Sequence, residues 1–64
     1  MGTRVMMIQG PYKSEGTAIM AVKSWGYVFW RRLIFKRGYQ YASSTGFANV
    51  FQREDNRWYI EVKP

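Results

Sequence analysis

The strongest strand-like pattern lies in the middle of the chain, where aromatic and branched apolar residues mix with positive charges. Residues 27–36 read YVFWRRLIFK and are rich in the residue types that favour strands. Arg37-Gly38 follows, and Tyr39-Gln40-Tyr41-Ala42 continues with further aromatic residues. The pattern predicts a strand, a two-residue turn at Arg37-Gly38 and a second strand.

A second hairpin is predicted near the C-terminus. Residues 47–53 (FANVFQR) and 57–62 (RWYIEV) are joined through Glu54-Asp55-Asn56. With Asp55-Asn56 as the central turn residues, Arg57 pairs with Glu54, and every second side chain points to the same face. The apolar face then carries Phe47, Phe51, Trp58, Ile60 and Val62, and the solvent face carries Gln52, Glu54, Arg57, Tyr59 and Glu61.

Residues 17–25 (TAIMAVKSW) fit two structures. As a helix, the segment has Ser14 near its N-cap and Gly26 just past its C-terminus, and it places Ala18, Val22 and Trp25 on one face. Its short length and the missing acidic residue of a capping box argue against that helix. We therefore expect a strand, with a helix as the alternative.

Composition excludes most familiar catalytic chemistry. The chain has 64 residues, with 10 Lys or Arg, 4 Asp or Glu and no His, which gives a formal net charge of +6, and it has no Cys. Without imidazole or thiol, it lacks Ser-His-Asp and Cys-His catalytic sets, zinc and haem ligands, and disulfides. The four acids are too few and too scattered for a calcium or two-metal cage. We expect no enzyme, no catalytic or metal-binding residue and no cofactor.

Length points to one small domain over residues 1–64. A chain of this size buries only about 60% of the surface that its unfolded state exposes. A binding partner or a second copy of the chain, as in a homo-oligomer, would add stability. The apolar runs are far shorter than the roughly 20 residues needed to span a bilayer. The absence of Cys fits a soluble, intracellular protein of the cytoplasm, nucleoid or nucleus.

Residues 5–22 (VMMIQGPYKSEGTAIMAV) contain a short motif, in which Gly10-Pro11-Tyr12-Lys13 and Gly16-Thr17 separate two apolar stretches. The segment resembles the KOW motif of transcription-elongation factors and several large-subunit ribosomal proteins, with Ser14 where that family usually has Gly. The resemblance covers 18 of the 64 residues. It implies a small SH3-like barrel that contacts RNA, DNA or a transcription or translation complex.

The predicted fold is all-β, either a five- to six-stranded SH3-like barrel or a strongly bent antiparallel sheet. Six glycines at intervals of six to twelve residues also favour short strands over helices. The alternative is an α+β fold, in which one short helix over residues 14–25 packs on a four-stranded antiparallel meander.

Positive charge is concentrated in the first predicted hairpin, where four cations lie within seven residues with no acid between them. The two-residue turn places Lys36 opposite Tyr39 and puts Trp30, Arg32 and Tyr41 on the same surface. Cations beside aromatic rings are typical of proteins that bind single-stranded nucleic acid, because bases stack on the rings and phosphates pair with the cations. With Lys13 as a further phosphate contact, the candidate nucleic-acid-binding residues are Lys13, Trp30, Arg31, Arg32, Lys36, Arg37, Tyr39 and Tyr41.

The same hairpin also has a purely structural interpretation. Trp30, Tyr39 and Tyr41 are residue types that often pack in a core, and a nearby Arg32 would then protect an apolar hairpin from aggregation. Strict alternation points Arg31 into the apolar face, a cost that a β-bulge, a barrel rim or an acidic partner would relieve.

The predicted function is a small basic module that binds DNA or RNA, or that belongs to a nucleoprotein complex. The alternative is a protein-interaction module, an accessory subunit or virus-encoded inhibitor that docks on an acidic surface of a larger complex. A cationic amphipath at a membrane surface and a His-free ribonuclease are less favoured.

Overall fold

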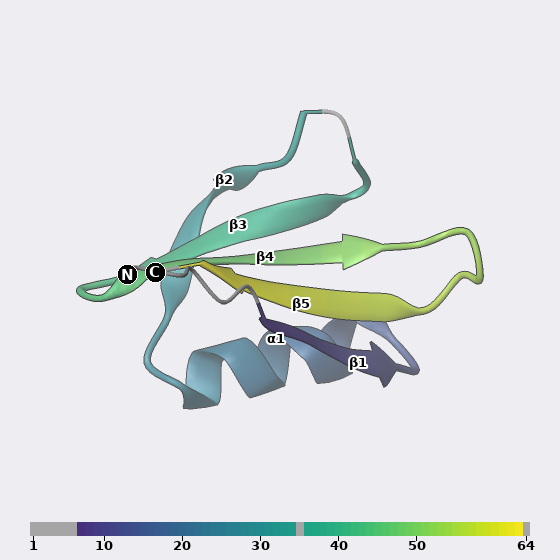
Figure 1. Ribbon diagram of the computed structural model, residues 1–64, viewed down its shortest axis with the longest axis horizontal. Coiled ribbons are helices and arrows are strands. Elements are labelled where there is room, and N and C mark those ends of the chain that lie inside the picture. Colours follow the sequence, from purple (N-terminus) through teal and green to yellow (C-terminus); the bar gives the residue numbers. More distant parts are fainter. Residues whose placement is uncertain (1–6, 35, 64) are drawn as a thin grey trace, which may run out of the picture.

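Five strands and one helix make up the part of the chain that the computed structural model describes, residues 7–34 and 36–63 (Figure 1). The strands are β1 (Met7–Tyr12), β2 (Val28–Arg32), β3 (Gly38–Ser43), β4 (Gly46–Gln52) and β5 (Trp58–Lys63), and the helix α1 (Glu15–Ser24) follows β1. All neighbours pair antiparallel in the order β1-β5-β4-β3-β2. The expected five-stranded antiparallel sheet is confirmed, and because β1 and β2 are its two edges, it is not closed into a barrel.

Residues 15–24 form a helix, so the strand expected over residues 17–25 is wrong and the helical alternative is correct. Ser14 caps the helix, because its Oγ accepts a hydrogen bond from the backbone N–H of Thr17 at 3.2 Å. The KOW-like segment therefore continues into a helix rather than into the second strand that the resemblance implies. Its first two residues, 5 and 6, lie outside the described residues.

The C-terminus of α1 is closed by a Schellman motif. Gly26 has a φ of 91°, and its N–H donates to the carbonyl of Lys23 at 3.0 Å. The N–H of Tyr27 donates to the carbonyl of Val22 at 3.3 Å. Ala18 and Val22 are fully buried one turn apart. Caps at both ends and this buried pair explain why so short a helix forms.

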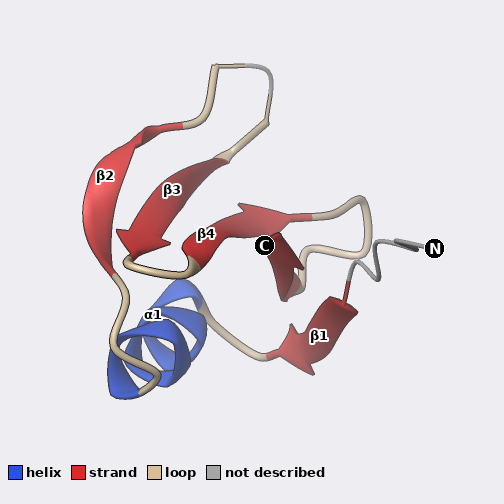
Figure 2. Ribbon diagram, turned by 60° about the vertical axis from the view of Figure 1, so that its left-hand side comes forward, coloured by secondary structure: helices blue, strands red, loops and turns tan. Residues whose placement is uncertain are grey.

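The core lies between α1 and one face of the sheet (Figure 2), where the helix contacts β4, β5 and β1. Its buried members are Ala18, Val22, Tyr41, Ala48, Val50, Trp58 and Ile60. The helix does not extend over β2, whose five residues are all exposed. The edge formed by β2 therefore projects beyond the core.

The β4–β5 hairpin forms, but its turn is one residue longer than predicted. The N–H of Arg53 donates to the carbonyl of Arg57 at 3.0 Å, which leaves a three-residue loop in place of a two-residue turn at Asp55-Asn56. Asn56 takes a φ of 65°, the left-handed conformation that ends this kind of loop and that Asn tolerates well.

The longer turn shifts the β4–β5 register by one residue relative to the prediction. Phe51 pairs with Tyr59, and Phe47 pairs with Lys63. Phe47 and Phe51 therefore point away from the helix rather than into the core, and Ala48 and Val50 take their places. The inward placement of Trp58, Ile60 and Val62 and the outward placement of Tyr59 and Glu61 are confirmed.

The β2–β3 turn was also predicted wrongly. Arg32 pairs with Tyr39, so residues 33–37 connect the strands in place of a two-residue turn at Arg37-Gly38. The pairing of Lys36 with Tyr39 is therefore not formed.

A β-bulge interrupts β2 between Phe29 and Arg31. Phe29 pairs with Tyr41 on the helix side of the sheet, while Arg31 pairs with Gln40 on the opposite side. The bulge is one of the three ways in which the sequence allowed Arg31 to avoid the apolar face. Trp30, the extra residue in the bulge, is 59% exposed.

Gly38 should tolerate no side chain. An added Cβ would lie 2.8 Å from the Cα of Phe51 and closer still to the carbonyl oxygen of Val50. We expect Gly38→Ala to lower the free energy of unfolding by about 1–3 kcal/mol, because both contacts are backbone atoms in a paired strand. The midpoint of urea denaturation measures this loss.

Gly16→Ala is the matched control. Gly16 lies in the first turn of α1, where the nearest atom to an added Cβ is the Ser14 Oγ at 4.0 Å. This change should leave stability unchanged or raise it by up to about 1 kcal/mol, because Ala is the better helix former. Equal midpoints for the two variants would contradict the packing described for Gly38.

Candidate functional site

The face of the sheet opposite α1, here called the open face, is polar and aromatic. In the described ranges, no helix or strand packs on it. Because side chains alternate along each strand, it presents the partners of the inward-facing core residues. Its members are Ile8 from β1, Val28 and Arg31 from β2, Gln40 and Ala42 from β3, Phe47, Asn49 and Phe51 from β4, and Tyr59, Glu61 and Lys63 from β5.

Two cations lie over two stacked rings on this face. The rings of Phe51 and Tyr59 are 6.2 Å apart between centroids and 28° from parallel. The Nζ of Lys36 lies 4.5 Å from the Phe51 centroid, and the Cζ of Arg53 lies 4.4 Å from the Tyr59 centroid and 5.6 Å from that of Phe51. Cation–π attraction and side-chain packing therefore hold both charges above the sheet. The Phe51 ring is only 4% exposed although no helix covers it.

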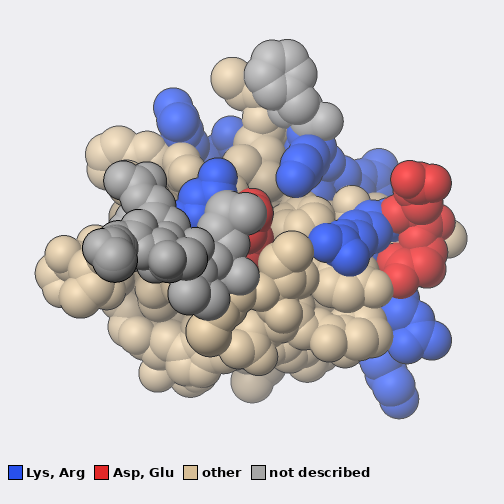
Figure 3. Space-filling model, viewed as in Figure 1, with Lys and Arg blue, Asp and Glu red and all other residues tan. Residues whose placement is uncertain are grey.

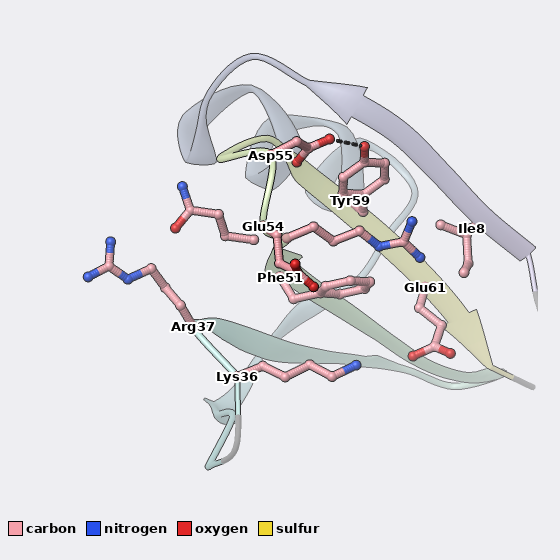
Figure 4. A pocket seen from close by; sticks show the side chains of 10 residues that line it. Ile8, Lys36, Arg37, Phe51, Glu54, Asp55, Tyr59 and Glu61 are labelled. Atoms are coloured by element: carbon pink, nitrogen blue, oxygen red, sulfur yellow. Dashed lines mark hydrogen bonds between the residues drawn. The ribbon is translucent and has the colours of Figure 1, made fainter.

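A groove of about 770 Å³ runs beside these rings (Figure 4). It is lined by Ile8, Lys36, Arg37, Phe51, Gln52, Arg53, Glu54, Asp55, Tyr59 and Glu61. A second hollow of about 210 Å³ shares Lys36 and Glu61 with it and reaches Asn49, Lys63 and the residues Leu33 and Ile34 of the β2–β3 connection. The two hollows together cross the open face.

A polar row crosses the sheet between the rings of Phe47 and Phe51. The pairings Arg31–Gln40, Gln40–Asn49 and Asn49–Glu61 place four polar side chains side by side on adjacent strands. The Nε–H of Arg31 donates to the Oε1 of Gln40 at 3.0 Å.

Asn49 is the buried polar residue of this row. It is 9% exposed, and its Oδ1 accepts no hydrogen bond from the described residues. An amide oxygen in this condition is costly, because it has lost water without gaining a donor. The hollow that Asn49 lines therefore contains an acceptor that lacks a donor among the described residues.

Asp55 and Tyr59 are coupled at one end of the groove (Figure 4). The hydroxyl of Tyr59 donates to Asp55 Oδ2 at 2.6 Å, and the backbone N–H of Arg57 donates to Asp55 Oδ1 at 2.9 Å. The hydrogen bond from Tyr59, followed by that from Arg57, lowers the pKa of Asp55 below its usual value. The same carboxylate raises the pKa of Tyr59.

The structure brings together only some of the residues predicted as one site. Tyr41 is 4% exposed and belongs to the core, and Tyr39 and Arg32 lie on the helix side of the sheet. There the carboxylate of Glu15 raises the pKa of Tyr39, through a hydrogen bond first and through its charge second. Arg32, Lys36, Arg37 and Tyr39 nevertheless line one hollow of about 300 Å³ together with Glu15. Trp30 and Tyr41 do not line it, because the bulge and the longer connection change the register.

Three predicted cations do meet at the open face. Lys36 and Arg37 line the groove, and Arg31 lies in the polar row. Trp30 is exposed at the β2 edge, and Lys13 is exposed in the turn before α1, away from the groove lining.

The two rings and Arg53 were not among the predicted site residues. The predicted register places Phe51 in the core and Tyr59 on the solvent face. The signal that could have found them is Asn56, whose tolerance of the left-handed conformation fits a three-residue turn. That turn alone moves Phe51 beside Tyr59.

Charge is unevenly distributed over the molecule. Figure 3 shows Lys and Arg side chains spread over the upper half of the view and around the end of the β4–β5 hairpin, where Asp and Glu side chains also gather. The part of this view that α1 occupies in Figure 1 carries few charges. Among the described residues, every Lys and Arg except Lys13 and Lys23 belongs to β2–β5 or to the loops that connect them.

Comparison of the chain with protein-family models, curated proteins and solved structures gave no match. Among the described residues, no helix is both long and apolar enough to cross a membrane.

The Asp55–Tyr59 hydrogen bond should make stability depend on pH. Because the folded state lowers the pKa of Asp55, the bond stabilises the fold above the ordinary carboxyl value of 3.8, and this contribution is lost as the pH falls through the lower folded value. We expect Tyr59→Phe to be less stable than the natural chain at pH 7 and nearly as stable at pH 2.5.

Chemical denaturation at the two pH values provides the measurement. Asp55→Asn is the companion variant and should show the same convergence at low pH. A loss for Tyr59→Phe that is equally large at pH 2.5 and pH 7 would show that packing of the ring, rather than this hydrogen bond, is responsible.

Proposed function

We propose that this protein binds single-stranded nucleic acid across the open face of its sheet. The observation that carries the proposal is the pair of cations, Lys36 and Arg53, held over the stacked rings of Phe51 and Tyr59 in a groove of about 770 Å³. Cations fixed beside a groove favour the phosphates of a polyanion, and each neutralised phosphate releases counterions.

Further cations surround this pair. Arg37 lines the same groove, Lys63 lines the adjoining hollow, and Arg31 stands at the end of the polar row. The formal net charge of +6 adds a general attraction for nucleic acid. A backbone that follows the two hollows would meet a cation along most of its path.

Phe47 supplies a surface for stacking a base. Its ring is 41% exposed on the open face, two residues from Asn49 on the same strand and opposite Lys63 on β5. Stacking of a base on an aromatic side chain contributes about 1–3 kcal/mol and requires an unpaired base.

The geometry favours single strands over duplexes. Proteins that read a duplex usually insert a helix or a ribbon into the major groove. The helix α1 carries one cation, Lys23, and one acid, Glu15, so it offers little charge to two phosphate backbones. An open sheet with exposed aromatic residues instead resembles the platforms on which single-stranded bases lie.

The test is binding of fluorescein-labelled single-stranded DNA and RNA at several salt concentrations. Replacing Lys36 and Arg53 together with Gln should weaken binding and make the slope of log K against log salt shallower by about 1.4, the contribution of two phosphate contacts to a single strand. Fluorescence anisotropy measures both quantities.

The control replaces Lys13 and Lys23 with Gln. Lys13 precedes α1 and Lys23 lies in its last turn, and the double change removes the same charge without touching the groove. Its salt slope should remain close to that of the natural chain. Equal slopes for the two double variants would indicate only a diffuse charge effect, and a flat salt response of the natural chain would reject the proposal.

A different surface supports a second function, docking on an acidic protein. The edge strand β2 exposes Val28, Phe29 and Trp30 at 66%, 54% and 59%, next to Arg31 and Arg32. Aromatic and Arg side chains together are frequent at the energetic centres of protein interfaces. This edge is uncovered by α1 and is separate from the groove lining.

Pull-down from nuclease-treated lysate distinguishes the two functions. If a protein partner binds through the β2 edge, it should survive nuclease, should be lost with Trp30→Ala and should be kept with Phe47→Ala. Loss of all co-purifying material after nuclease treatment supports the nucleic-acid proposal instead. Circular dichroism of both variants checks that the fold is retained.

A further inference from the structure

The polar row of the open face also has the chemistry to select among bases. We propose that Asn49 and Glu61 form a subsite that prefers guanine in the bound strand. The inference rests on the proposed function and adds a base preference to it.

Asn49 carries a buried acceptor without a donor among the described residues. Asn49 is nine-tenths buried, and its Oδ1 accepts no hydrogen bond from the described residues. It lines the hollow of about 210 Å³ together with Lys36, Glu61 and Lys63. A ligand that brings an N–H group to this oxygen would remove the cost of leaving it unpaired.

Glu61 on β5 is the cross-strand neighbour of Asn49. Glu61 pairs with Asn49 across β4 and β5, so the two side chains project from adjacent strands on the same face and line the same hollow. An ionised carboxylate only accepts hydrogen bonds. The Asn49 oxygen and the Glu61 carboxylate are both acceptors on this hollow, so a ligand edge with two neighbouring donors would satisfy both.

The four bases differ in the hydrogen-bond donors on their Watson–Crick edges. The Watson–Crick edge of guanine presents N1–H and N2–H₂ next to each other, whereas adenine and cytosine present one amino group beside a ring-nitrogen acceptor. The edge of thymine or uracil carries a single N–H between two carbonyl acceptors. Of the four bases, guanine alone offers adjacent donors, and placing an acceptor against the Asn49 and Glu61 oxygens would leave polar atoms unpaired.

The ring of Phe47 lies close to Asn49 along β4. Phe47 precedes Asn49 by two residues on the same face, a separation of about 6.8 Å along the strand. A base stacked on the exposed Phe47 ring would direct its edge toward Asn49. The Asn49 oxygen has almost no exposed surface, so a side chain that lines the hollow must shift to admit the base.

The experiment uses fluorescein-labelled thymidine nonamers with one central dG, deoxyinosine or dA, and the plain thymidine nonamer as reference. Deoxyinosine keeps N1–H and lacks only the N2 amino group. We expect the dG nonamer to bind about fivefold or more tightly than the dA nonamer, with deoxyinosine between them.

Asn49→Leu is the decisive variant. It should bind the dG and dA nonamers equally and should unfold at the same or a higher urea concentration than the natural chain, because an apolar group of similar size replaces an unpaired buried oxygen. Gln40→Leu, the neighbouring amide in the same row, is the matched control and should keep the preference for dG.

The outcomes separate this inference from the proposed function. If the natural chain binds all four nonamers with equal affinity, the guanine subsite is rejected while single-strand binding stands. A dG preference that persists in Asn49→Leu also rejects the subsite. If none of the nonamers binds even at low salt, the proposed function itself fails.

Discussion

The structure depends on one constraint, the width that a single helix can cover. An α-helix with its side chains is about 10–12 Å across, and neighbouring strands lie about 4.8 Å apart, so one helix covers two or three strands. Here α1 contacts β1, β5 and β4, leaving the β2 edge beyond its reach, and among the described residues no second layer covers the opposite face. The open face and the β2 edge are both exposed because α1 covers only one face of three strands.

The open face compensates for the missing layer with long charged side chains. Phe51 is only 4% exposed, and the charged ends of Lys36 and Arg53 lie over its ring. The same side chains thus exclude water from the sheet and present charge to a ligand. Binding and stability are consequently linked at this face, since any ligand that draws these cations away from the rings also uncovers them.

Much of the fold follows from local signals in the sequence, whereas the site depends on register. Ser14 and Gly26 marked both ends of α1, and the strands near residues 39–42, 47–53 and 57–62 were predicted close to their positions, whereas the strand predicted over residues 27–36 is confirmed only for residues 28–32. Loop length was not readable from the same signals. One extra turn residue before Arg57 transfers Phe51 to the opposite face, and the bulge at Trp30 does the same for Arg31. Alternation predicts that two faces exist, and only turn geometry decides which residues occupy each.

Irregularities at both edges of the sheet limit how the protein can associate with itself. On one edge, β1 carries a register shift between Gln9 and Tyr12 and includes Pro11, which has no backbone N–H. On the other, β2 is bulged and carries Arg31 and Arg32. Neither edge therefore offers a regular, uncharged row of backbone groups on which a cross-β fibril could grow. These irregularities disfavour edge-to-edge association of a chain that is rich in aromatic residues.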